Sequence, residues 1–114
     1  MKRRFRLTRS TDIQRVRRLG KSYAHPLIVF IVAPNELQQV RIAVVAGRAV
    51  GTAVQRNLAK RRLRACLDQW IACLPGGNDV VVLARKPMSQ AGFPEICAAM
   101  QQLVKRAGLL YDRT

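Results

Sequence analysis

The segment from Asp79 to Ala84 constrains the fold most, because its residues, DVVVLA, are apolar almost without interruption. A strand with one solvated face alternates apolar and polar residues, whereas a strand covered on both faces is apolar throughout. The apolar pattern of the preceding segment is interrupted just before Asp79 by four turn-forming residues, Pro75, Gly76, Gly77 and Asn78. The sequence therefore predicts a central strand that is covered on both faces.

Apolar spacing and breaking residues predict six further elements around this strand. Ser10 and Thr52 are good N-cap residues, and Gly20 and Gly108 are suitable helix ends. The predicted helices cover residues 11–19, 52–74 and 94–107. The other predicted strands cover residues 21–24, 27–33 and 39–46, and the last two are expected to pair antiparallel. Residues 1–9 are basic and aperiodic, so we expect a mobile N-terminal segment on a single α+β domain, 1–114.

The charge of the chain restricts its partners. There are 21 Lys and Arg residues against 6 Asp and Glu, a net charge of +15, yet 49% of the residues are hydrophobic. Such a composition predicts a folded body rather than a disordered basic tail. A folded body with this excess charge repels itself, and a polyanion relieves that repulsion. Nucleic acid is the first partner to consider, and an anionic membrane surface is the second.

Other sequence features exclude several classes of protein. The longest apolar run, residues 27–33, is far shorter than the ~20 residues that span a bilayer. Cys66, Cys73 and Cys97 are odd in number and lack zinc-site spacing. Because all three lie in apolar helical patterns, we expect buried free thiols in a reducing cytoplasm. The sequence thus predicts a soluble cytoplasmic protein without a membrane partner.

Catalytic side chains are sparse. The chain has one histidine, His25, and its six acidic residues are scattered singly. Nucleases and phosphatases usually cluster carboxylates around metal ions or place a histidine beside a nucleophile. A phosphate-binding glycine loop is also missing from the sequence. We therefore expect no protein catalytic residue, no metal held by the protein and no small-molecule substrate.

The segment 48–64, RAVGTAVQRNLAKRRLR, is the most informative part of the chain. It holds six basic residues, and no acidic residue occurs between Val40 and Cys66. Like charges four residues apart weaken an isolated helix, so an anion that neutralises them explains this pattern better than a solvated helix surface. At 100° per residue, five polar side chains share an arc of about 140°. These are Arg56, Asn57, Lys60, Arg61 and Arg64.

Aromatic residues leave alternatives open. Trp70 could stack on a base, but its place in an apolar helical stripe favours the core. Phe30 could be a core residue or a stacking platform for single-stranded RNA on an open sheet face. The sequence does not decide between these two roles of Phe30.

At these positions the chain resembles the protein subunit of bacterial ribonuclease P. The family signature combines a basic residue, a glycine, Ala-Val, Arg-Asn-Arg, Lys-Arg and Arg. It occurs here as Arg48, Gly51, Ala53-Val54, Arg56-Asn57-Leu58, Lys60-Arg61 and Arg64. Further similarity lies in Leu7-Thr8, Gly20-Lys21-Ser22, residues 41–44, 79–81, 84–85 and 106–110. The resemblance therefore covers nearly the whole chain.

The resemblance implies an α-β-β-β-α-β-α two-layer sandwich with a left-handed βαβ crossover, similar to a ribosomal-protein domain. It implies a subunit of an endoribonuclease that removes the 5′ leader of precursor tRNA, with Mg²⁺-dependent catalysis carried by a partner RNA. The residues implied to bind the RNA subunit are Arg48, Arg56, Asn57, Lys60, Arg61 and Arg64. The candidates for binding the leader are Arg9, Ile13, Arg15, Arg17 and Phe30.

The chain departs from the family pattern at two places. Leu58 stands where the signature has a third polar residue, Arg, and Ile13 and Arg17 stand where the first helix usually has aromatic residues. The alternative function is that of a structural ribosomal protein or a general RNA chaperone, which the composition alone fits equally well. Two basic segments, 2–18 with eight basic residues and 41–64 with seven, suit two RNAs: a permanent partner and a substrate.

Overall fold

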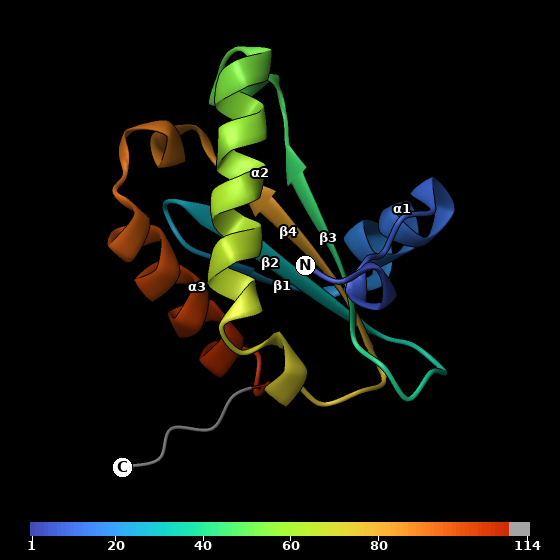
Figure 1. The fold of residues 1–114 in the computed structure, drawn as a ribbon. Helices are drawn as coiled ribbons and strands as arrows, with labels where there is room; N and C mark the ends of the chain where they lie inside the picture. Colours follow the sequence, from blue (N-terminus) through green and yellow to red (C-terminus); the bar gives the residue numbers. More distant parts are fainter. Residues whose placement is uncertain (110–114) are drawn as a thin grey trace.

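A mixed four-stranded sheet forms the centre of the computed structural model, which describes residues 1–109 (Figure 1). Its strands lie in the order β1-β2-β4-β3. They are β1 (Lys21–Ala24), β2 (Ile28–Pro34), β3 (Arg41–Ala46) and β4 (Asn78–Ala84). Because β4 lies inside the sheet and residues 79–82 are buried, the prediction of a covered central strand is confirmed.

The expected antiparallel pairing of the second and third strands is wrong. β4 lies between them, antiparallel to β2 and parallel to β3. An interior position covers both apolar faces of β4 and satisfies both of its backbone edges. This burial and backbone pairing involve residues far apart in sequence. The short connection between β2 and β3 favours a hairpin and therefore does not reveal that β4 lies between them.

Three helices cover the sheet: α1 (Ser10–Leu19), α2 (Ala53–Asp68) and α3 (Phe93–Arg106). Helices α2 and α3 lie on one face and α1 lies on the other (Figure 1). Thr52 is the N-cap of α2 and forms a capping box with Gln55, as its sequence position predicts. Helix α2 ends before the predicted residue 74, and a 3₁₀ turn, Ile71–Cys73, follows. No helix within residues 1–109 is long and apolar enough to cross a membrane.

The connection from β3 through α2 to β4 is a left-handed crossover. In Figure 1, α2 lies in front of the sheet, the parallel strands β3 and β4 point upward, and β4 lies to the left of β3. Nearly all such connections are right-handed, so this handedness is a distinctive property of the fold. It agrees with the fold that the sequence resemblance implies.

The two faces of the sheet bury different side chains. The larger cluster lies beneath α2 and α3 and includes Phe30, Leu63 and Met100, with Trp70 packed against it. Trp70 is half-buried in the turn after α2 and packs against the core, as expected, rather than forming part of its buried interior. The smaller cluster lies beneath α1, whose Val16 packs with Ile31 and residues of neighbouring strands. The cluster beneath α2 and α3 contains far more buried residues than the one beneath α1.

The N-terminal segment, expected to be mobile, is instead attached to the sheet. Phe5 and Leu7 are buried, and the backbone N–H of Leu7 donates to the carbonyl of Ile42 over 2.9 Å. Arg6 forms a parallel bridge with Ile42. Two apolar residues spaced within a basic run are too short a pattern to reveal this contact from sequence.

The prediction of three buried free thiols is also wrong. Cys66 of α2 and Cys97 of α3 form a disulfide, and Cys73 is free and exposed. Each helical pattern places its cysteine toward the interior, but only the packing of α2 on α3 brings the two Cα atoms to 5.2 Å. A disulfide can form at that separation.

Reduction of the disulfide is expected to lower the free energy of unfolding by about 3 kcal/mol, because the closed loop restricts the unfolded chain. The sequence separation is 31 residues. Thermal unfolding with and without a phosphine reductant measures the effect, and Cys73→Ala is the control that should respond as the wild type does. The disulfide would be contradicted if the unfolding curves with and without reductant superimposed, or if the chain had the same mass before and after reduction.

Candidate nucleic-acid interface

One face of α2 forms a shallow basic groove of about 450 Å³. Four of the five side chains predicted to share an arc line it, together with Val54. Within the described part of the chain, no acidic side chain forms an ion pair with these basic groups. The groove therefore keeps its positive charge. The predicted residues that line it are Asn57, Lys60, Arg61 and Arg64.

The remaining basic residues of this region do not line the groove. Arg56, the fifth member of the predicted arc, is half-buried, and its Nε is buried without a hydrogen-bond partner among residues 1–109. Arg48 is exposed in the 3₁₀ turn Arg48–Val50 that precedes α2. Arg62 turns away and donates to the carbonyl of Ala91 over 3.5 Å. The structure thus brings four predicted residues together in the groove, and Arg48 and Arg56 lie outside this group.

The sheet face beside α1 is the second candidate surface. Val29, Leu83 and Val45 lie in register across β2, β4 and β3, and all three are half-buried. Ile13 of α1 packs against the same cluster, while Arg17 is exposed on the helix. This surface combines an apolar floor with a basic border; Arg9, just before α1, is also exposed.

Two leader-binding candidates have other roles in the structure. Phe30 is completely buried beneath α2 and α3, so the idea that it is a stacking platform is wrong. Successive residues of a strand face opposite sides, and Phe30 lies on the face that α2 and α3 cover. Arg15 is half-buried, and its guanidinium binds Asp79 at 2.5 Å. Arg15 therefore anchors α1 to the sheet.

Asp79 is the centre of a buried polar cluster that the sequence does not reveal. Its carboxylate has no exposed surface and accepts hydrogen bonds from Arg41 Nε and Nη2 at 2.9 and 2.8 Å. Asn35 Nδ2 donates to it over 2.7 Å. Asp12 of α1 lies 3.9 Å from the guanidinium groups of both Arg15 and Arg41. The one sequence signal for this cluster is that an acidic residue begins an otherwise apolar central strand.

The surroundings of Asp79 decide its ionisation. Burial opposes the charged form, but hydrogen bonds from Arg41, Asn35 and Arg15 and the charge of Arg41 outweigh it, so the pKa of Asp79 lies below its usual value. The hydrogen bond to Asp79 in turn raises the pKa of Arg41. The carboxylate is therefore charged at neutral pH and holds both guanidinium groups in place.

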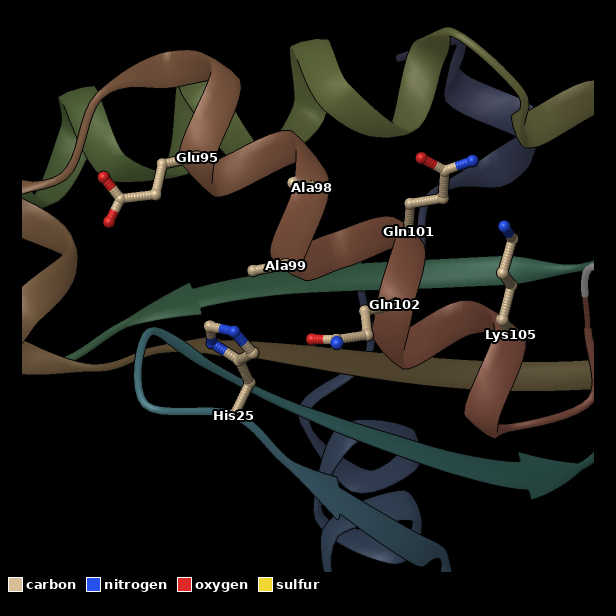
Figure 2. A pocket seen from close by; sticks show the side chains of 7 residues that line it. All are labelled: His25, Glu95, Ala98, Ala99, Gln101, Gln102 and Lys105. Carbon is tan, nitrogen blue, oxygen red and sulfur yellow. The ribbon is translucent and has the colours of Figure 1, made fainter.

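A third groove, between α3 and the turn after β1, has a different character (Figure 2). Figure 2 shows Glu95 and Lys105 at opposite ends, with small and amide side chains between them. His25 Nδ1 accepts the backbone N–H of Leu27 over 3.0 Å. The charged groups do not converge on one point, and within residues 1–109 no three His, Cys, Asp or Glu side chains gather as metal ligands.

Comparison with known proteins decides the family. The family model described as ribonuclease P matches residues 1–108. The chain belongs to the ribonuclease P protein family. The ribonuclease P protein component of Herpetosiphon aurantiacus is 35% identical over 113 residues, covering 99% of this chain and 92% of that protein. The corresponding protein of Roseiflexus sp. is 35% identical over 111 residues, covering 96% and 91%.

Solved ribonuclease P proteins share the fold. The Staphylococcus aureus protein superposes with a TM-score of 0.86 at 25% identity, covering 94% of this chain and 98% of that one. The Thermotoga maritima protein superposes with a TM-score of 0.79 at 28% identity, covering 89% and 96%. The ribonuclease P fold implied by the sequence resemblance is therefore confirmed.

Replacing Asp79 is expected to lower the stability of the fold at neutral pH. It should also reduce the amount of stability that the protein loses in acid. The pKa of Asp79 is lower in the folded chain than the ~3.9 of an unfolded one, so its stabilisation is present above that value and is lost as the pH falls through the folded pKa. Asp79→Asn should lower the free energy of unfolding at pH 7 by about 2–3 kcal/mol, since both guanidiniums are partly exposed.

Denaturant unfolding between pH 2 and pH 7 measures both effects of Asp79→Asn, over a range set by the ordinary carboxyl pKa of ~3.9. The control is Asp68→Asn, because Asp68 is an exposed carboxylate paired with the N-terminal ammonium at 3.1 Å; its effect should be at most about 1 kcal/mol. The role assigned to Asp79 would be refuted if Asp79→Asn were as stable as the wild type at pH 7. It would also be refuted if the variant lost as much stability in acid as the wild type does.

Proposed function

We propose that this chain is the protein subunit of a cytoplasmic ribonuclease P that binds its catalytic RNA through the basic groove of α2. The observation that carries the proposal is the acid-free groove on α2 in a member of this family. The RNA subunit cleaves precursor tRNA, and this chain binds the 5′ leader and thereby assists the cleavage. Precursor tRNA and the RNA subunit are its two partners.

The chemistry of the groove supports contact with an RNA backbone. Lys60, Arg61 and Arg64 present cations on one face, and Asn57 adds an amide that can donate hydrogen bonds. Arginine grips phosphate through two N–H groups, and each phosphate that is neutralised releases counterions. We assign Arg48 and Arg56, which do not line the groove, to the same RNA on the strength of their positive charge.

The sheet face beside α1 is the proposed leader site. A single strand exposes its bases, which pack on apolar side chains, while its phosphates attract basic residues. Val29, Leu83 and Val45 supply the apolar floor, and we assign the phosphate contacts to Arg17 and Arg9. The first helix has Ile13 where aromatic residues are usual, so aliphatic packing replaces stacking at that position.

The Mg²⁺ ion that the family implies does not fit a site made by the described residues. Asp79 is enclosed by guanidinium groups, Asp12 lies near two of them, and Asp68 is paired with the N-terminal ammonium. Mg²⁺ in proteins is usually held by one or two carboxylates together with phosphates and water, and these three carboxylates already face cations. We therefore assign Mg²⁺ to the RNA and assign this chain the tasks of binding and positioning.

Cleavage assays test the proposed function. Precursor tRNA should be cleaved with multiple turnover at low Mg²⁺ only when both this chain and its cognate RNA are present. The holoenzyme should bind leader-bearing tRNA more tightly than mature tRNA. Equal affinities would refute leader binding, and co-purification of ribosomal RNA in place of a single other structured RNA would favour the alternative of a ribosomal protein or RNA chaperone.

Single substitutions in the groove should change the salt dependence of RNA binding. Arg64→Ala removes one phosphate contact, so the slope of log K against log salt should become shallower by about 0.7–0.9. The loss of affinity should be greatest at low salt. Lys21→Ala is the matched control, because Lys21 is exposed on β1, at the sheet edge opposite β3. An unchanged slope for Arg64→Ala would remove this face from the interface.

A further inference from the structure

Two apolar side chains on α2 point away from the core. Val54 is 75% exposed and Leu58 is 36% exposed, although Ala59, Leu63 and Leu67 of the same helix are buried. Val54 and Leu58 are four residues apart, so they lie one above the other on the helix surface. Large exposed apolar residues are few among residues 1–109, and two of the five form this pair.

The pair lies inside the basic surface of α2. At 100° per residue, Val54 and Leu58 follow Arg61 around the helix and precede Arg62. Val54 lines the basic groove with Asn57 and Lys60. Leu58 lines a small neighbouring cavity, as do Arg62 and Met88. Arg61 therefore borders the apolar pair on the groove side, and Arg62, whose guanidinium donates to the carbonyl of Ala91, lies on the other side.

We propose that Val54 and Leu58 form an apolar contact for an unpaired nucleotide of the RNA that occupies the groove. The proposal rests on the proposed function and specifies what this face binds. In an RNA duplex the base faces are stacked and hidden, and only phosphates and riboses reach a flat protein surface. An unpaired nucleotide offers an apolar base face between two phosphates. An apolar pair between cations matches that alternation.

The surrounding charge favours RNA over a protein partner. A protein seated on Val54 and Leu58 would also have to cover Lys60, Arg61 and Arg62, and the described residues supply them no ion pair. Covering cations without counter-charges is costly. RNA supplies the counter-charges itself, because each nucleotide carries one phosphate and one base, so charges and bases alternate along the strand. Leu58 thus replaces a phosphate contact with a base contact on this helix.

The salt dependence of binding distinguishes an apolar contact from an ionic one. Val54→Ala and Leu58→Ala should each weaken assembly with the cognate RNA by about 3- to 10-fold at every salt concentration, because the contact releases no counterions. The slope of log K against log salt should stay as in the wild type. Leu58→Arg should steepen that slope by about 0.7–0.9.

Two controls isolate the site. Leu37→Ala removes a leucine that is 48% exposed outside α2, so it should leave affinity unchanged. A blunt, fully paired RNA duplex should bind the wild type, Val54→Ala and Leu58→Ala equally. Thermal midpoints of these variants should match the wild type, because the substituted side chains are exposed.

Three outcomes would overturn the proposal: wild-type affinity of both alanine variants for the cognate RNA, a changed salt slope in either of them, or an equal loss on the paired duplex. Failure of the wild-type chain to bind the cognate RNA at all would instead refute the proposed function.

Discussion

The ion cluster around Asp79 joins the parts of this protein that carry its two candidate surfaces. Asp79 lies on β4, and its carboxylate holds Arg41 of β3, Arg15 of α1 and Asn35 of the loop after β2. A buried carboxylate without such partners would be strongly destabilising. The cluster therefore fixes the position of α1 on the sheet, since Val16 is the only residue of α1 that is fully buried.

β4 connects the two sides of the molecule. Asp79 and Val81 face α1, while Val80 and Val82 face the core beneath α2 and α3. Helix α2 packs over β3 on one face of the sheet, and the opposite face beside α1 is partly open, since Val29, Val45 and Leu83 are half-buried there. The basic groove and the apolar floor lie on opposite sides of one sheet.

The ion pairs of the described residues leave the basic groove without a counter-charge. Asp12 and Asp79 neutralise arginines inside the fold, and Asp68 neutralises the N-terminal ammonium. The basic side chains of the groove have no such counter-charge within residues 1–109. The groove therefore contributes positive charge that no described acidic residue offsets to the net charge of +15.

The sequence by itself determined what depends on neighbours along the chain: the covered strand 79–84, the N-cap at Thr52 and the polar arc of Asn57, Lys60, Arg61 and Arg64. Periodicity and capping are local, so they can be predicted from one segment. Only the tertiary structure decided what depends on contacts between distant segments. It inserted β4 between β2 and β3, joined Cys66 to Cys97, buried Phe30 and assigned Arg15 to Asp79. Each of these results required two elements to pack at a particular distance and orientation, which no single segment specifies.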